Sequence, residues 1–99
     1  MFDPSMLGKL QEMQQKMEDT KSRLQTITVK GFSPGNKVQV IASADKKIQS
    51  VQIDPSLLQQ DPEELEDHLI IAVNQAIQAA ENVWESEMRG VAMGFMPGT

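Results

Sequence analysis

Evenly spaced basic residues are the feature of this sequence that points most clearly to an interaction. Four of them recur every seven positions: Lys9, Lys16, Arg23 and Lys30. On a helix that reached Lys30, they would lie on one side, about 10.5 Å apart along the axis, and could follow the phosphates of a nucleic-acid backbone. A structural interpretation also exists, because Glu12 precedes Lys16 by four residues, the favourable order for a helical ion pair. The residues alone leave both interpretations open.

Catalytic and metal chemistry has little support in the sequence. The chain has no cysteine and one histidine, His68, which excludes a disulfide framework, a thiolate metal site and a cysteine nucleophile. His68 could serve as a general base, but it follows the acidic run of residues 63–67, whose charges favour the start of a helix. We interpret it as a solvated polar side chain. We expect no catalytic residue, no metal and no cofactor, and a protein that is not an enzyme.

The charges are distributed unevenly along the chain. There are nine basic and fourteen acidic side chains, for a formal net charge of −5. Residues 1–60 hold eight of the basic and six of the acidic side chains, whereas residues 61–99 hold one and eight. The bulk charge therefore disfavours nucleic acid as a partner, and only a local basic stripe could attract it.

The sequence predicts no membrane segment. Its longest apolar run, residues 69–73, is far shorter than the ~20 residues that span a bilayer. The first residues also lack the pattern of a secretory signal. We expect a cytoplasmic protein with no membrane partner and no small-molecule substrate.

The 99 residues are enough for one domain, 1–99, and its first element is a long helix. Apolar residues recur at alternating steps of four and three, with Thr20 filling one step: Met6, Leu10, Met13, Met17, Leu24 and Ile27. This spacing predicts a helix through residue 27, which Asp3-Pro4 would begin well. Because three of the seven seam positions are methionine, the seam should pack adaptably.

Residues 27–53 change to a period of two, which is typical of strands. Three short runs alternate apolar and polar residues, around Val29, around Val40 and around Val51. Ser33-Pro34-Gly35-Asn36 is a strong turn, and residues 44–47 form a weaker one. The pattern predicts a three-stranded antiparallel meander.

A second long helix should follow a short helical turn that Asp54-Pro55-Ser56 begins. Asp61, Pro62 and Glu64 form its start signal, and it should run to Met88 or Arg89, leaving about 90–99 as a flexible tail. Its apolar surface is wider than one sheet face can cover. We therefore expect part of it to contact a second copy of the chain, through Ala72, Ala76, Ile77, Ala80, Val83 and Trp84. The resulting fold class is α+β, in the order α-β-β-β-α.

One stretch carries a family resemblance. The sequence Val51-Gln52-Ile53-Asp54-Pro55-Ser56-Leu57-Leu58, followed by Asp61, Glu64-Leu65-Glu66-Asp67 and Ala72-Val73-Asn74, resembles the YbaB/EbfC family of bacterial nucleoid-associated proteins. Met13-Gln14-Gln15-Lys16-Met17 and Glu87-Met88 also match, so that the resemblance covers nearly the whole chain. It implies a homodimer whose sheets join and whose helices project as arms. It also implies a location in the nucleoid, binding to double-stranded DNA with little sequence preference, and a role in gene regulation.

The chain departs from the family pattern in its second helix. Many members carry an Asn-Asp pair where this chain has Asn74-Gln75, and basic residues where it has Gln78-Ala79-Ala80. DNA contacts would then fall to Lys9, Lys16, Lys21, Arg23 and Arg89. The alternative hypothesis is an acidic dimeric protein-interaction module, such as a chaperone or adaptor, that has lost DNA binding.

Overall fold

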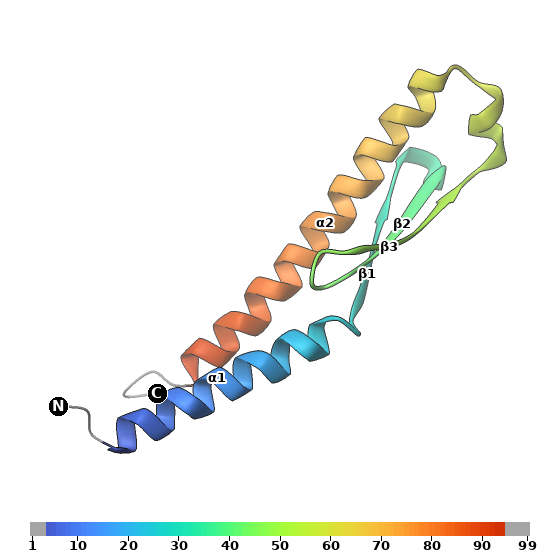
Figure 1. The fold of residues 1–99 in the computed structure, drawn as a ribbon. Helices are drawn as coiled ribbons and strands as arrows, with labels where there is room; N and C mark the ends of the chain where they lie inside the picture. Colours follow the sequence, from blue (N-terminus) through green and yellow to red (C-terminus); the bar gives the residue numbers. More distant parts are fainter. Residues whose placement is uncertain (1–3, 95–99) are drawn as a thin grey trace.

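The computed structural model describes residues 4–94 and confirms the predicted order of elements (Figure 1). A three-stranded antiparallel sheet lies between two long helices in the chain order, with a short 3-10 helix after the first strand and another after the third. Their bounds are α1 Pro4–Leu24, β1 Thr28–Phe32, η1 Pro34–Asn36, β2 Val38–Ser43, β3 Ile48–Ile53, η2 Pro55–Gln59 and α2 Pro62–Met93.

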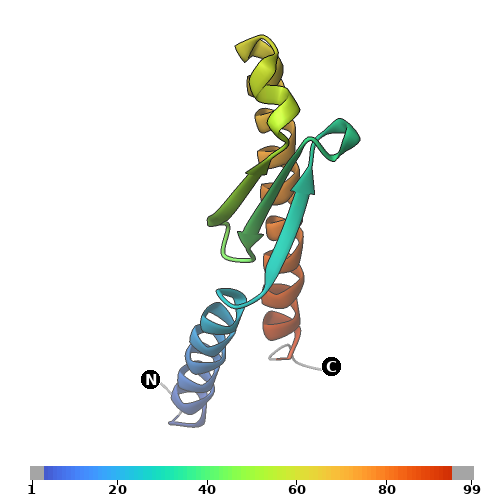
Figure 2. The same ribbon diagram turned by 90° about the vertical axis from the view of Figure 1, so that its right-hand side faces the viewer.

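The sheet has the order β1-β2-β3, and α2 crosses only part of it (Figures 1 and 2). The helix packs against β1 and β2. Alternation along β2 turns the fully buried Val38, Val40 and Ala42 toward α2, where they meet Ala72 and Ala76 in the core. All six residues of β3 are exposed. The single chain therefore covers one face of two strands and leaves the third uncovered.

Gly31 brings β1 and α2 unusually close together. A Cβ built on Gly31 would lie 2.1 Å from the carbonyl oxygen of Ala72 and 2.4 Å from the amide nitrogen of Ala76. Contacts this short with backbone atoms leave no room for a side chain. The absence of a side chain at Gly31, facing the small residues of α2, thus sets the distance between helix and sheet.

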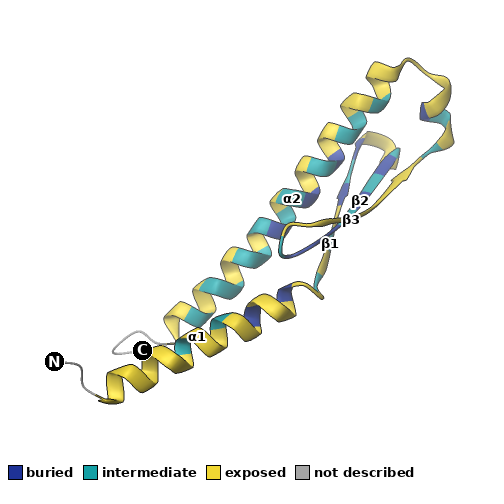
Figure 3. Ribbon diagram, viewed as in Figure 1, coloured by how far each residue is buried: buried dark blue, intermediate teal, exposed yellow. Residues whose placement is uncertain are grey.

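The two helices form an arm that projects from the sheet. α1 runs antiparallel to the C-terminal half of α2, and the described residues extend over 67 × 21 × 19 Å (Figure 1). Thr20 and Leu24 are buried, whereas Met13 and Met17 are only half-buried. Figure 3 shows the N-terminal part of α1 as almost wholly exposed. The predicted seam therefore packs against α2 mainly at its C-terminal end.

The ends of both helices differ from the prediction. α1 ends at Leu24 rather than at residue 27, because the amide and the hydroxyl of Thr26 both donate to the carbonyl of Arg23 and close the last turn. Lys30 is therefore part of β1. α2 continues past Arg89 to Met93, since Val91 lines the contact with α1 and packing there outweighs the low helix propensity of Gly90. The predicted cap at Asp3 and residues 95–99 of the predicted tail lie outside the described residues.

Candidate nucleic-acid interface

The structure brings two of the predicted basic residues to one groove. Lys16 and Arg23 lie seven positions apart on α1 and line a groove between α1 and α2 of about 300 Å³. Thr20 lies between them on the same side of α1. The wall opposite comes from α2 and consists mostly of small residues: Ser86, Glu87, Gly90, Val91 and Gly94. The groove is open, has polar and apolar surface in about equal parts, and is located on the projecting arm.

Arg23 has an acidic partner in this groove. Its guanidinium donates a hydrogen bond to the Glu87 carboxylate and forms an ion pair with it across the two helices. The Arg23 side chain remains 53% exposed and that of Glu87 35% exposed. Because the pair is largely solvated, it ties the arm together only weakly. It also neutralises one of the charges that DNA would contact.

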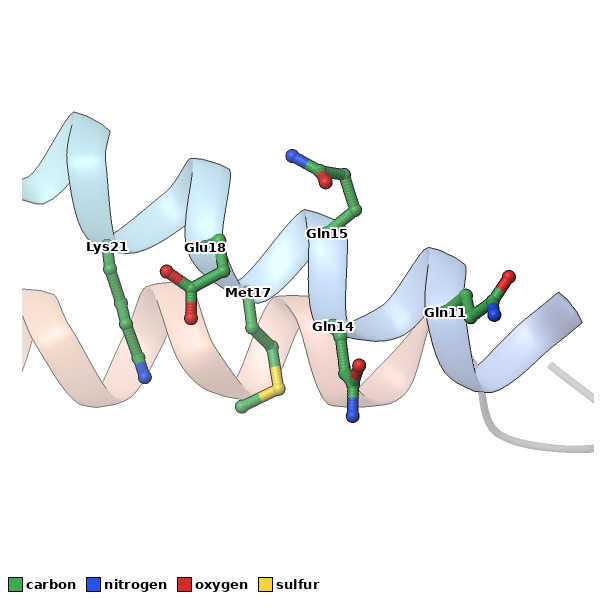
Figure 4. A pocket seen from close by; sticks show the side chains of 6 residues that line it. All are labelled: Gln11, Gln14, Gln15, Met17, Glu18 and Lys21. Carbon is green, nitrogen blue, oxygen red and sulfur yellow. The ribbon is translucent and has the colours of Figure 1, made fainter. Parts of the chain in front are cut away.

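Lys21 lies on the other flank of α1, in a second groove. That groove is lined by α1 residues alone: Gln11, Gln14, Gln15, Met17, Glu18 and Lys21. In Figure 4 the side chains of Gln14, Met17 and Lys21 point to the same side of the helix, and that of Gln15 points away. The groove is rich in glutamine and holds one acid beside its one cation, so it offers phosphates less charge than the groove of Lys16 and Arg23.

Lys9 and Arg89 are separate from these two grooves. Lys9 lies at the exposed end of α1, beside the apolar side chains of Met6, Leu10 and Met13. Its spacing places it on the same side of α1 as Lys16. Arg89 is exposed on the side of α2 that faces away from the sheet. Only Lys9, Lys16 and Arg23 therefore share one side of the arm.

The residues predicted for a dimer interface divide into two groups. Ala72, Ala76 and Ala80 are fully buried within the single chain. In the single chain they are core residues rather than surface residues, because α2 turns its small side chains toward its own sheet, where Gly31 allows close approach. Ile77, Val83 and Trp84 are half-buried, and the ammonium of Lys46 lies 5.5 Å from the centre of the Trp84 ring. These three keep surface that a second copy could contact.

The sequence prediction missed a larger apolar surface on β3. Val51 pairs with Val40 and Ile53 pairs with Val38, so their side chains lie on the same face of the sheet as the core. Beyond the edge of α2, Ile48 and Val51 are each 43% exposed and Ile53 is 36% exposed. The period-two pattern identified these residues as apolar, but it could not show that β3 is a terminal strand without a helix above it.

At the opposite edge of the sheet, a side chain of α2 bonds one backbone amide of β1. The Gln75 side chain accepts a hydrogen bond from the outward-facing amide of Phe32 on β1, at 2.7 Å. α2 also packs against β1. Both edges are without a neighbouring strand among the described residues, but they differ in that one outward-facing amide of β1 is bonded within the chain.

His68 has a structural partner. Its Nδ1 lies 2.7 Å from the Ser33 hydroxyl oxygen, which also accepts a hydrogen bond from the amide of Val38. His68 thus connects α2 to the turn between β1 and β2. Residues 4–94 contain no cluster of side chains that could hold a metal ion. Neither α1 nor α2 has an apolar stretch long enough to cross a membrane.

The family-like stretch around Asp54 also has a structural role. The Asp54 carboxylate accepts a hydrogen bond from the Ser56 amide and begins η2. This bond, the Ser56 hydroxyl and the nearby Lys37 ammonium lower the pKa of Asp54 below its ordinary value. The most specific part of the resemblance thus marks how the chain passes from the sheet to α2, rather than a binding site.

Known proteins resemble this chain over most of its length. A family model described as the YbaB/EbfC DNA-binding family matches residues 3–95. A nucleoid-associated protein of Flavobacterium johnsoniae is 44% identical over 92 residues, which cover 93% of this chain and 86% of that protein. A nucleoid-associated protein of Caldanaerobacter subterraneus is 36% identical over 96 residues, or 95% and 86% of the two chains. The crystal structure of an uncharacterised protein from Helicobacter pylori matches with a TM-score of 0.81 at 25% identity, over 93% of this chain and 99% of that one.

Proposed function

The chain belongs to the YbaB/EbfC DNA-binding family, and from this premise we propose that it is a homodimeric, nucleoid-associated protein that binds double-stranded DNA with low sequence specificity. Its site would be the arm, where side chains of α1 contact phosphates. Its location would be the nucleoid, as the names of its relatives suggest. The family is one of DNA-binding proteins and not of enzymes, and the role proposed is the organisation of DNA and an influence on gene expression.

The observation that carries this proposal is the shared side of α1. Lys9, Lys16 and Arg23 are separated by about 10.5 Å along the helix axis, and the arm carries them away from the acidic N-terminal half of α2. Phosphate contacts carry no sequence information. Because lysine and arginine on an exposed helix can meet any backbone, low sequence specificity follows. Lys21 and Arg89 remain secondary candidates, since each faces another direction.

The asymmetry of the sheet edges supports the homodimer. Pairing of β3 with β3 of a second copy would continue the sheet and bring Ile48, Val51 and Ile53 into cross-strand contact with apolar residues of that copy. The β1 edge is less suited to pairing, because Gln75 already occupies the amide of Phe32. A chain of 99 residues with a thin core gains from such completion.

The first experiment measures DNA binding. Fluorescence anisotropy of a labelled duplex of about 30 bp, at roughly 50 and 200 mM salt, should show binding that weakens steeply with salt. Lys16→Glu should lower the affinity and reduce the salt slope by about 0.9 for the lost phosphate contact. Lys47→Glu makes the same charge change in the turn between β2 and β3, outside the arm, and should have a smaller effect. Equal effects of the two variants would contradict the proposed surface.

A second experiment measures the oligomeric state. Val51→Lys places a charge on the uncovered apolar face of β3 and should shift sedimentation from dimer to monomer. Ser50→Lys is the matched control, because Ser50 pairs with Ile41 and faces the other side of the same strand. A dimer that survives Val51→Lys would exclude pairing through β3. Circular dichroism would confirm that both variants keep their secondary structure.

The alternative function, a protein-interaction module, draws on the exposed end of α1. Met6, Leu7 and Leu10 are 55%, 51% and 48% exposed, and a methionine-containing apolar surface of this kind accommodates varied partners. Absence of DNA binding at about 50 mM salt, together with an intact dimer, would favour this function over the first.

A further inference from the structure

We propose that the groove between α1 and α2 is a binding site for a DNA backbone phosphate, and that Glu87 occupies it in the free protein. On binding, Arg23 would exchange the Glu87 carboxylate for a phosphate oxygen. The inference rests on the proposed function and adds the position of one contact and the residue that competes for it. Glu87 then lowers the affinity for DNA, although it does not itself contact the phosphate.

The Arg23–Glu87 pair is the first step of the argument. A guanidinium presents parallel N–H groups that fit a carboxylate and a phosphate in the same way. The Glu87 carboxylate on Arg23 is therefore a chemical stand-in for a phosphate group. Because both side chains are partly exposed, the exchange needs no opening of the core and requires only rotation of the Glu87 side chain.

The shape of the groove is the second step. Gly90 lies on the α2 wall, and a Cβ built there would meet no atom within 4 Å, so this wall stays open. Ser86 adds a hydroxyl that can donate to a phosphate oxygen. Lys16 lies about 10.5 Å from Arg23 along the axis of α1, where it would meet another phosphate.

The charge of the groove is the third step. Glu87 is the single acidic residue among the described residues that line it, against the two cations Lys16 and Arg23. When DNA binds, the displaced carboxylate stays attached to α2 close to the phosphates. Unlike a released counterion, it continues to repel them. Removing this one charge should therefore strengthen binding through Arg23.

The test compares Glu87→Gln with the unmodified protein and with Glu85→Gln. Glu85 lies two residues earlier on α2, is exposed and does not line the groove, so its variant makes the same charge change outside the site. Anisotropy with the duplex of about 30 bp should show about tenfold tighter binding for Glu87→Gln, which corresponds to one charge-assisted hydrogen bond. Its salt slope should be steeper by up to about 0.9, because the carboxylate that offsets the charge of Arg23 beside the phosphate is gone. Glu85→Gln should change the affinity much less.

Arg23 provides the second arm of the test. In proteins that carry Arg23→Gln, the Glu87→Gln change should bring no further gain, since the group that it frees is missing. A gain that persists without Arg23 would overturn the inference, and so would a Glu87→Gln protein that binds no more tightly than Glu85→Gln. If the unmodified protein and all variants fail to bind DNA, the proposed function is refuted, and this inference with it. Binding by the unmodified protein without the Glu87→Gln gain refutes the inference alone.

Discussion

Replacement of Gly31 by alanine should destabilise the protein strongly. The new Cβ would lie 2.1 and 2.4 Å from backbone atoms of Ala72 and Ala76, and neither β1 nor α2 can yield locally. Overpacking of a core costs about 1–3 kcal/mol, and collision with backbone on both sides places this substitution near the upper limit. A reduced entropy of the unfolded chain offsets about 0.4–1 kcal/mol of that cost. We expect a net loss of about 2 kcal/mol in the free energy of unfolding.

For a domain of this size, that loss corresponds to a Tm lower by roughly 8–16 °C. The measurement is thermal unfolding followed by circular dichroism at one fixed protein concentration, because the proposed dimerisation would make Tm concentration-dependent. Gly8→Ala is the matched control: Gly8 lies in α1 with no atom within 4 Å of its built Cβ. It should raise stability by up to about 1 kcal/mol through helix propensity. A Gly31→Ala protein that melts within about 2 °C of the parent would refute the close approach of helix and sheet, given the sensitivity expected of Tm.

Two further substitutions test the turns that surround the sheet. Ser33→Ala should lower the free energy of unfolding by about 1–3 kcal/mol in urea denaturation, because it removes the acceptor of the buried Val38 amide; a change near zero would mean that water or another group replaces the hydroxyl. Asp54→Asn tests the lowered pKa of Asp54. A carboxyl with a lowered folded-state pKa contributes stability above its ordinary pKa of 3.8 and loses it as the pH falls through the folded-state value. The stability difference between the parent and Asp54→Asn should therefore be constant near neutral pH and shrink below pH 3.8; a difference that does not change with pH would contradict the role of the charge.

The order of elements could be predicted from the sequence because each element has its own periodicity. Steps of four and three identified α1, and alternation around Val40 and Val51 identified the strands and their inner faces. The proline-containing starts at Asp54 and Asp61 placed η2 and α2. These signals are local, so they can be interpreted without knowing which residues are in contact across the core. The end of α1 was predicted less well, because a hydrogen bond of Thr26 decided it.

The candidate site depends on contacts between distant parts of the chain, and these were not predictable. Arg23 and Glu87 are 64 positions apart, and neither residue marks the other in the sequence. The stripe of Ala72, Ala76 and Ala80 permits close approach to a sheet as well as to another helix. The position of Gly31 opposite these alanines shows that they pack against the sheet and not against another helix. Joining of two copies through β3 remains a prediction.

The shallow attachment of α1 has a consequence for motion. Only Thr20 and Leu24 near its C-terminal end are buried, and Met6, Leu7 and Leu10 have little to hold them. Regions with few buried contacts open at low free energy without global unfolding. Amide hydrogens in the first turns of α1 should therefore exchange with solvent far faster than those of β2, while the sheet stays intact. A ligand that binds the arm would slow hydrogen exchange in α1 selectively. Amide protection along α1 would therefore measure how much of the protein has ligand bound to the arm.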